Sequence, residues 1–248
     1  MTMAFEEDVR DRLFASMEVV PGDFTFDDSV ARVFSDMICR SVPCYRDLVQ
    51  LMAVLAGRFL HSGAICFDLG CSLGAVSAAL LGQYSHLGLS VIAVDNSEAM
   101  IDRLRQRLAG EIEGGQLQVR CEDLTEVDTS GASLLVLNLT LQFIAPEQRL
   151  ALLRRLRERL QPGGGLLLAE KVHSANPDAE RLLSEAHAGF KRAHGYSELE
   201  ISRKRTALER VMRLDTAEMH AERLRAAGFT QVVPWFQCLN FMAWAAWV

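Results

Sequence analysis

A short apolar run that ends in an acid and two glycines, residues 66–74, constrains this sequence more than any other stretch. An alanine-rich segment with helical spacing follows it, so the pattern predicts a strand, a tight turn and a helix in succession. Glycines in such a turn let a ligand approach the backbone closely, and the start of the helix presents N–H groups that lack intrahelical partners. The stretch therefore predicts a site for a nucleotide-type ligand.

Departures from the dinucleotide-binding pattern indicate which ligand this is. In the register of G-x-G-x-x-G, Ser72 and Ala75 replace the second and third glycines, which disfavours NAD. The run instead resembles motif I of class I S-adenosylmethionine-dependent methyltransferases. In that motif an aspartate two positions before the first glycine orders the loop and the methionine end of the ligand. Asp68 stands at that position, two before Gly70.

Two other interpretations of the turn stay open at this point. Residues 70–74 also spell G-x-S-x-G, the nucleophile elbow of α/β-hydrolases, with Ser72 as nucleophile and His173 or His220 as the base. Against it, the sequence has no His-Gly-Gly oxyanion motif upstream. The third interpretation is a strand–helix turn that binds no ligand.

Length and charge bound the class of protein. With 248 residues, 50% of them hydrophobic, the chain is long enough for one α/β domain with a full core. A formal net charge of −6 argues against broad binding to nucleic acid or to an anionic membrane. No signal-peptide pattern and no apolar stretch of membrane-spanning length are present, so we expect a cytoplasmic protein. Six cysteines lie scattered without C-x-x-C pairs, and we expect neither disulfides nor a metal.

Hydrophobic periodicity predicts a regular alternation of strands and helices from residue 64 onward. Such an alternation implies a parallel sheet with helices on both faces. Residues 5–60 read as helical, with helix starts at Phe26-Asp27-Asp28-Ser29 and Pro43-Cys44-Tyr45. One predicted strand ends at Asp68, and the others cover 89–95, 117–122, 132–138 and 165–171. The predicted helices cover 74–84, 97–109 and 146–160, and Pro162-Gly163-Gly164-Gly165 breaks the helical pattern after the last of them.

The C-terminal part is predicted to be helical and then extended. Helices are expected at 177–194, 197–212 and 215–227, with capping boxes at Ser197/Glu200 and Asp215/Glu218 and with Gly228 after the last helix. Two strands follow, near 231–236 and 240–248. We expect a single domain, 1–248, made of a helical N-terminal cap (1–60), a cofactor-binding core (61–172), a helical insertion (173–228) and a terminal hairpin (229–248).

Polar residues end several predicted strands, where ligands of open α/β sheets bind. Asp95 lies 25 positions after Gly70, near the spacing at which a carboxylate meets a ribose. A helix N-cap is the alternative for Asn96, and it can coexist with a ligand role. Asp123 can accept from an adenine amino group while a neighbouring backbone amide completes the contact. Asn138 can serve the amino-acid end of the ligand. Tyr45 is either an aromatic core residue or a ligand contact.

Several further stretches resemble one family more closely than the superfamily. They are Thr25-Phe26-Asp27, Ser41-Val42-Pro43-x-Tyr45, 68–75, Asp95-Asn96-Ser97, Thr140-Leu141-Gln142-Phe143, 191–202 (Lys-Arg-Ala-His-Gly-Tyr-Ser-Glu-Leu-Glu-Ile-Ser) and Trp235-Phe236-Gln237-Cys238. Together they resemble the carboxy-S-adenosyl-L-methionine synthase family. The likeness implies a Rossmann-like class I methyltransferase fold, with a mostly parallel seven-stranded sheet, an antiparallel terminal hairpin and added N-terminal helices.

The resemblance also implies the chemistry. Members of the family convert S-adenosyl-L-methionine and prephenate into carboxy-S-adenosyl-L-methionine and phenylpyruvate, and a tRNA carboxymethyltransferase uses the product to modify a wobble uridine. Neither direct contact with nucleic acid nor a metal is implied. A group leaving prephenate is expected to act as the base, so no protein general base is required. His173, His187 and His220 lie on predicted helices or at a strand end, where we expect surface histidines.

The family's contacts are carried over position by position. The cofactor contacts are Tyr45, Gly70, Cys71, Ser72, Asp95, Asn96, Asp123, Leu124 and Asn138, and the carboxylate-binding arginine is Arg205. The sequence departs from the family at His194 and Glu98, neither of which is a matched contact. For Arg205 a solvated helix face, 203–205, remains the alternative.

Assembly and rival functions complete the expectations. The family is dimeric, and the insertion mixes charge with apolar residues, so we expect a homodimer with residues 177–212 near its interface. The apolar positions concerned are Leu182, Leu183, Phe190, Ile201 and Leu208. An ordinary S-adenosylmethionine-dependent methyltransferase of a small molecule or RNA, or a module that binds the cofactor without turnover, are the alternatives.

Overall fold

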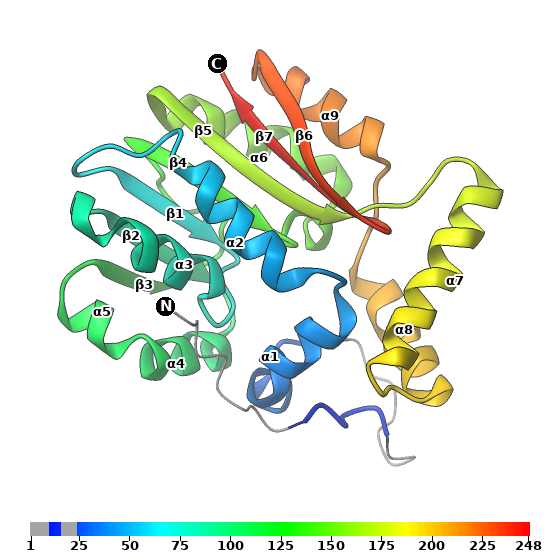
Figure 1. Ribbon diagram of the computed structural model, residues 1–248. Helices are drawn as coiled ribbons and strands as arrows, with labels where there is room; N and C mark the ends of the chain where they lie inside the picture. The colour runs from blue at the N-terminus through cyan, green and yellow to red at the C-terminus, as the bar shows by residue number, and fades with distance from the viewer. Residues whose placement is uncertain (1–9, 16–23) are drawn as a thin grey trace.

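A mixed seven-stranded sheet forms the centre of the computed structural model, which describes residues 10–15 and 24–248 (Figure 1). The strand order is β3-β2-β1-β4-β5-β7-β6; the first five in this order are parallel, and β7 is antiparallel to both β5 and β6. The strands are β1 (Ile65–Leu69), β2 (Ser90–Asp95), β3 (Leu117–Cys121), β4 (Ala132–Asn138), β5 (Leu160–Lys171), β6 (Gln231–Cys238) and β7 (Phe241–Trp247). The predicted Rossmann-like methyltransferase fold with its terminal hairpin is confirmed.

Helices cover both faces of the sheet and its carboxyl edge (Figure 1). They are α1 (Asp28–Ser41), α2 (Tyr45–Ala56), α3 (Ala75–Tyr84), α4 (Glu98–Arg107), α5 (Ala109–Glu113), α6 (Pro146–Arg159), α7 (Pro177–Ala193), α8 (Glu198–Val211) and α9 (Ala217–Ala226), with short 3-10 turns η1 (Ser85–Leu87) and η2 (Leu141–Phe143). Within the described ranges, no helix has the length and apolar character needed to cross a bilayer.

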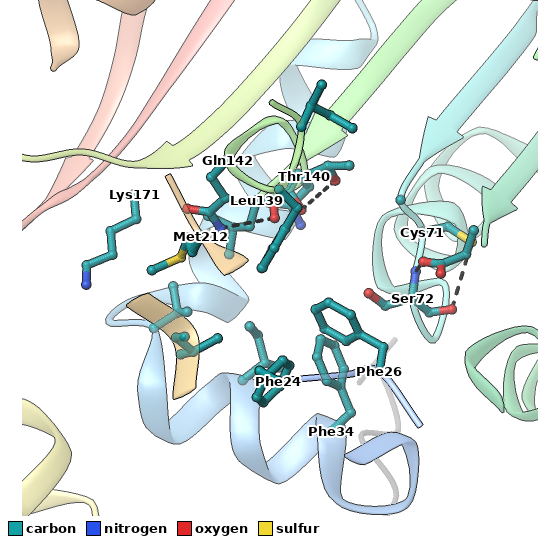
Figure 2. A pocket seen from close by; sticks show the side chains of 18 of the residues that line it. Phe24, Phe26, Phe34, Cys71, Ser72, Leu139, Thr140, Gln142, Lys171 and Met212 are labelled. Atoms are coloured by element: carbon teal, nitrogen blue, oxygen red, sulfur yellow. Dashed lines mark hydrogen bonds between the residues drawn. The ribbon is translucent and has the colours of Figure 1, made fainter. Parts of the chain in front are cut away.

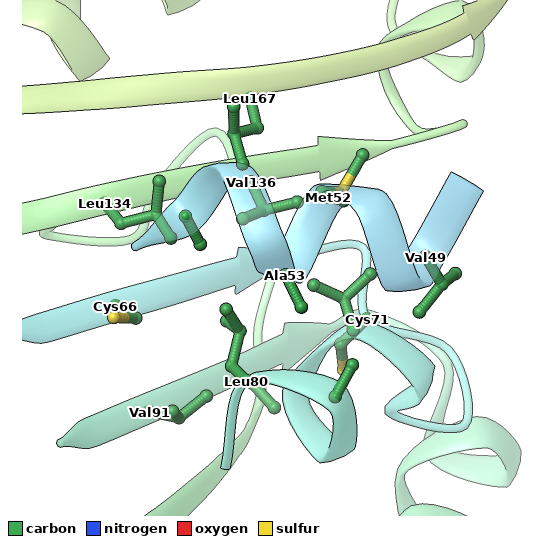
Figure 3. Packing of buried hydrophobic residues seen from close by; sticks show 14 of the residues in the cluster. Val49, Met52, Ala53, Cys66, Cys71, Leu80, Val91, Leu134, Val136 and Leu167 are labelled. Atoms are coloured by element: carbon green, nitrogen blue, oxygen red, sulfur yellow. The ribbon is translucent and has the colours of Figure 1, made fainter. Parts of the chain in front are cut away.

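Strand β4 shows why this sequence forms a doubly covered sheet. Residues 134–137 are apolar and buried on both faces, as in strands covered by helices on each side. Leu134 and Val136 pack with α2 and α3, and Leu135 and Leu137 pack with α6 on the opposite face. Figure 3 shows the first face, where Met52 of α2 lies over the strands. Each fully buried side chain of this size stabilises the fold by about 1.5–3 kcal/mol.

The N-terminal helices start where the sequence predicts. Asp27 caps α1, and its carboxylate accepts a hydrogen bond from the Val30 N–H at 3.0 Å. Cys44 precedes α2 in the left-handed conformation, with φ of 57°. The expected helical content before residue 24 lies mostly outside the described residues, and residues 10–15 are not helical.

The glycine run at 162–165 does not end a helix as predicted; it lies inside β5. Helix α6 already ends at Arg159, and β5 starts at the next residue, with a register shift against β4 between Ala132 and Leu134. A Cβ on Gly164 would lie 2.9 Å from the Ser133 carbonyl oxygen, and one on Gly165 would lie 2.4 Å from the Phe59 ring. The glycines therefore permit close packing of a strand.

Two further helix predictions need correction. The segment 97–109 is two helices, α4 and α5, joined at Leu108. The predicted capping box at Asp215 is wrong, because the Thr216 hydroxyl accepts from the Met219 N–H at 3.2 Å and caps α9. The Asp215 carboxylate instead forms ion pairs with Arg149 and Arg223. The capping box at Ser197 and Glu200 is present, and Gly228 follows α9 with φ of 103°.

Candidate active site

A cavity of about 620 Å³ lies at the carboxyl ends of β1–β5, and residues of α1, α7 and α8 line its other walls. This volume is in the usual range for small-molecule sites. Nine of the ten predicted site residues line it: Tyr45, Gly70, Cys71, Ser72, Asp95, Asn96, Asp123, Leu124 and Asn138. Arg205 does not line it. That residue is exposed on α8, although its charge lies near enough to affect Lys191 inside the cavity.

The glycine-rich turn is held from below by β2. The N–H groups of Gly70 and Cys71 both donate to the Val94 carbonyl oxygen, at 2.8 and 2.9 Å. Gly70 has φ of 78°, and a Cβ there would lie 2.4 Å from the Thr140 side chain. Glycine is therefore required both by the backbone conformation and by the close approach of Thr140.

Two carboxyl groups, the buried Asp68 and the half-buried Asp95, support this turn. Asp68 accepts hydrogen bonds from the Ser77 N–H (3.1 Å) and hydroxyl (2.8 Å) at the start of α3. Asp95 accepts from the Ser72 and Ser97 N–H groups at 2.9 and 3.0 Å. Burial raises the pKa of both, that of Asp68 to about 6, and the charge of Asp95 contributes to the rise at Asp68. A cationic ligand in the cavity would stabilise their ionised forms.

Asn96, the residue after the end of β2, does not cap the helix that follows. Ser97 caps α4, since its hydroxyl accepts from the Met100 N–H at 3.2 Å. Asn96 is therefore not the N-cap that the sequence offered as one interpretation, and it lines the cavity instead.

The adenine-side prediction falls on the loop after β3. Asp123 accepts hydrogen bonds from the Thr125 N–H (2.8 Å) and hydroxyl (2.6 Å), which lower its pKa. The neighbouring Leu124 is half-buried in the cavity wall. A contact of either residue with adenine stays a prediction.

Tyr45 is buried in the core cluster, as one of its two interpretations holds, and it also lines the cavity, so its contact with a ligand stays a prediction. Burial raises the pKa of its hydroxyl well above the ordinary value, and the charge of Asp68 adds to this. The hydroxyl therefore stays protonated and can donate a hydrogen bond.

Two buried amide oxygens at the end of β4 lack partners. Neither Asn138 Oδ1 nor Gln142 Oε1 accepts a hydrogen bond, and both residues line the cavity. An unpartnered buried acceptor is unfavourable, so these oxygens fit a ligand that carries N–H donors, such as the ammonium group of S-adenosylmethionine.

Glu170 holds the loop that presents these amides, a role the sequence analysis missed. Its fully buried carboxyl accepts from the N–H groups of Thr140 (3.1 Å), Leu141 (2.7 Å) and Gln142 (3.1 Å). Burial raises the pKa of Glu170 to about 8, against the lowering effect of these donors. The signal for this role is an acid near the end of a strand that is otherwise apolar and buried. The loop that it holds is distant from it in sequence, so the sequence alone does not show the contact.

An aromatic cluster forms one wall of the cavity and was also missed. Phe24 and Phe26 precede α1, Phe34 lies on it, and Figure 2 shows all three gathered below the cavity. The ring centroids of Phe24 and Phe26 are 5.1 Å apart, and those of Phe26 and Phe143 are 5.4 Å apart. These side chains give the cavity an apolar surface that limits access of water.

The part of the cavity away from the glycine-rich turn is basic. Lys171 at the end of β5, His187 and Lys191 on α7, and Lys204 on α8 line it; Figure 2 shows Lys171 on the side opposite Ser72. Lys204 is 3% exposed, so the alternative of a solvated face over 203–205 does not hold for this residue, whereas Arg205 is exposed.

The histidine predictions are partly wrong, and a hydrolase triad does not form. His187 and His220 are buried rather than on the surface. His220 packs against Trp244 with ring centroids 5.1 Å apart, and neither it nor His173 lines the cavity that holds Ser72. Ser72 therefore has no base from either candidate. Among residues 10–15 and 24–248, no group of three potential metal ligands is found.

The sheet order and the glycine turn at the end of β1 define a class I methyltransferase fold. A methyltransferase-domain family matches residues 66–164. The solved structure of human N-acetylserotonin methyltransferase in complex with SAM superposes with a TM-score of 0.59 at 18% identity, over 88% of this chain and 55% of that one.

Curated relatives place the chain within this class. It is 54% identical over 236 residues to a carboxy-S-adenosyl-L-methionine synthase of Pseudomonas putida, covering 93% of this chain and 95% of the relative. It is 52% identical to a protein of the same name from Pseudomonas fluorescens, with the same coverage. The chain belongs to the carboxy-S-adenosyl-L-methionine synthase family, as its sequence motifs indicated.

Proposed function

We propose that this chain converts S-adenosyl-L-methionine and prephenate into carboxy-S-adenosyl-L-methionine and phenylpyruvate. The observation that carries the proposal is its 54% identity, over nearly the full length of both chains, to a relative named for that product. The cavity supports it, since acidic groups lie near the glycine-rich turn and basic groups lie on the other side. Such a site suits a cationic cofactor and an anionic second substrate together.

The residues near the turn bind and orient the cofactor. Asn138 and Gln142 accept from its ammonium group, and Asp95 accepts from the ribose hydroxyls while it holds the Ser72 N–H. The Asp123 carboxylate and the Leu124 backbone receive the adenine. The Tyr45 hydroxyl donates a hydrogen bond to the ligand, and Gly70 and Cys71 allow the ligand to approach the backbone closely.

When bound, S-adenosylmethionine supplies a sulfonium that makes the protons of its methyl carbon acidic. The chain's own contribution is to exclude water and to fix the geometry. Phe24, Phe26 and Phe34 shield the cavity with apolar surface, and Glu170 fixes the loop that carries the amide acceptors. No cavity residue is required to act as a general base, because the leaving group of prephenate takes the proton.

Arg205 is proposed to bind the carboxylate that distinguishes the product from S-adenosylmethionine. A guanidinium can bind this group through two parallel N–H bonds. Because Arg205 is exposed and does not line the cavity of its own chain, this role requires either a shift of α8 or a second copy of the chain. Mixing Arg205→Ala chains with chains disabled at Asp95 separates the two routes, since only sharing between copies restores activity.

We also propose a cytoplasmic homodimer with residues 177–212 near the interface. Leu182 is 67% exposed and Leu199 is 48% exposed on α7 and α8, which favours a partner there. Light scattering at micromolar concentration tests this, and a monomer contradicts it. The product then serves a tRNA carboxymethyltransferase, and this chain itself does not contact the tRNA.

Product analysis tests the function against its main alternative. With S-adenosylmethionine present, prephenate is consumed and phenylpyruvate is released, and neither happens when the nucleoside is left out. An ordinary methyltransferase would instead form S-adenosylhomocysteine with a methyl acceptor and leave prephenate unchanged. A module without turnover would bind S-adenosylmethionine and release no phenylpyruvate.

A further inference from the structure

Lys191 is a buried cation that the proposed cofactor contacts do not use. It lies near the end of α7, is 8% exposed and lines the cavity. Within the described part of the chain, the structure gives its ammonium group no hydrogen-bond or ion-pair partner. Lys204 is a useful contrast, because its ammonium donates to Ser41 Oγ at 2.9 Å and pairs with the Asp11 carboxylate at 3.4 Å. The ammonium group of Lys204 thus has partners among the residues that the structure describes, and that of Lys191 does not.

The groups around Lys191 make its position unfavourable without a ligand. Burial, together with the positive charges of Lys171, Lys204 and Arg205, lowers its pKa to about 7. His187, one turn earlier on α7, bonds the Ser41 carbonyl oxygen at 2.7 Å and offers no negative charge. A buried charge surrounded by like charges costs free energy that an anion in the cavity can offset.

The surroundings also indicate the shape of that anion. Leu208, Met212 and Phe241 also line the cavity and present apolar surface to it. The Phe241 ring packs against His187, one turn before Lys191 on α7, with ring centroids 5.2 Å apart. A carboxylate attached to a hydrophobic ring fits both features. Prephenate has this chemistry, and it carries two carboxylates: one on the ring, which is transferred, and one on the 2-oxo acid side chain, which stays on phenylpyruvate.

The two carboxylates place different demands on a binding group. The transferred carboxylate loses its charge as it leaves the ring, so a strong cation on it would stabilise the ground state and slow the reaction. The side-chain carboxylate keeps its charge throughout and can be bound equally in substrate, transition state and product. A fixed lysine suits the second.

We propose that the Lys191 ammonium binds the 2-oxo acid carboxylate of prephenate, the one retained in phenylpyruvate. This inference rests on the proposed function. It makes Lys191 a substrate-binding residue that lowers KM with little effect on kcat, because its contact is the same in the ground and transition states.

The test compares Lys191→Met with Lys191→Arg and with a control, Arg181→Gln. Arg181 lies on the same helix, is exposed and pairs with Asp178 outside the cavity, so the control removes one positive charge from α7 without touching the site. Phenylpyruvate binding is measured directly by calorimetry with S-adenosylmethionine present. The KM for prephenate and the affinity for S-adenosylmethionine alone are measured beside it.

We expect Lys191→Met to weaken phenylpyruvate binding and to raise the KM for prephenate by a similar factor, about 10- to 100-fold, as for loss of one charge-assisted hydrogen bond. Lys191→Arg restores part of both, and Arg181→Gln changes neither. The affinity for S-adenosylmethionine stays the same. Lys191→Met also raises Tm, since it removes an uncompensated buried charge, whereas loss of a structural lysine would lower Tm.

Three results overturn the proposal. Unchanged phenylpyruvate binding with a lower kcat assigns Lys191 to the transferred carboxylate, and an equal loss for S-adenosylmethionine assigns it to the cofactor's own carboxylate. Wild-type protein that does not bind phenylpyruvate at all removes the basis of the inference. Because calorimetry needs no turnover, these results stay distinct from failure of the proposed function, which is seen as absence of phenylpyruvate release by the wild type.

Discussion

Replacing Gly70 by alanine tests how tightly the turn at the end of β1 is constrained. Its φ of 78° disfavours any L side chain, and a new Cβ would lie 2.4 Å from two atoms of Thr140. Gly63 is a matched control, with φ of 74° and no heavy atom within 4 Å of the position of a new Cβ. Both substitutions incur the left-handed backbone penalty, and only Gly70→Ala adds overpacking.

The magnitudes follow from these two contributions. The backbone penalty is about 1–2 kcal/mol for each variant. Overpacking at Gly70 adds about 1–3 kcal/mol. For a chain of this size each kcal/mol lowers Tm by about 2–4 °C, so Gly70→Ala is expected to melt about 2–12 °C below Gly63→Ala. Its Kd for S-adenosylmethionine is expected to rise about tenfold or more, while that of Gly63→Ala stays the same.

Differential scanning fluorimetry and ligand titration measure both effects, and Thr140→Ala gives a further check. That change removes the two Thr140 atoms at 2.4 Å, although it also removes the Thr140 hydroxyl that donates to the Leu69 carbonyl oxygen at 3.0 Å. The Gly70→Ala/Thr140→Ala double variant should therefore be less destabilised than the sum of the single variants. Equal effects of Gly63→Ala and Gly70→Ala, or strict additivity in the double variant, would refute the reasoning.

Three other predictions concern charge and thiols. The affinity for S-adenosylmethionine should rise between about pH 5 and pH 7 as Asp68, with a pKa of about 6, loses its proton and attracts the cationic ligand; a pH titration in which Asp68→Asn keeps the same slope contradicts this. Asp215→Asn leaves the fully buried Arg149 without its carboxylate partner and should lower the free energy of unfolding in urea by about 3–5 kcal/mol. A decrease of less than about 1 kcal/mol would contradict this. Diamide should join Cys44 to Cys238, whose sulfur atoms lie 3.0 Å apart; peptide mass mapping should find the linked pair in the wild type and not in Cys44→Ser, and oxidation that links other cysteines argues against it.

The strand ends were predictable from the sequence because parallel strands bring their carboxyl ends to one edge. Asp95, Asp123 and Asn138 are far apart in the chain, yet all line one cavity. Their positions follow from strand order and direction alone, which hydrophobic periodicity reveals.

Local patterns failed where distant residues decided the outcome. The glycines at 163–165 resembled a helix stop, but they lie inside β5, where Gly164 packs closely against Ser133 and Gly165 against Phe59. Asp215 looked like a helix cap, but the buried guanidinium of Arg149 draws its carboxylate away. Neither neighbour is visible in a local window of sequence.

The basic side of the cavity was missed for the same reason. Lys191 enters the cavity only because α7 crosses the carboxyl edge of the sheet, far from the glycine turn in sequence (Figure 1). A weak signal existed, since Leu183, His187 and Lys191 recur every four residues and lie on one face of α7. A lysine that continues a partly buried helix face indicates either a paired core charge or a ligand.

The most direct test of the central claim follows the carboxyl carbon itself. Prephenate isotopically labelled in its ring carboxylate is incubated with the protein and S-adenosylmethionine, and the nucleoside products are analysed by mass spectrometry. The proposed function predicts a sulfonium nucleoside that is heavier by one labelled carboxyl group, together with unlabelled phenylpyruvate. Recovery of only unmodified S-adenosylmethionine, or of S-adenosylhomocysteine without any labelled nucleoside, would contradict it.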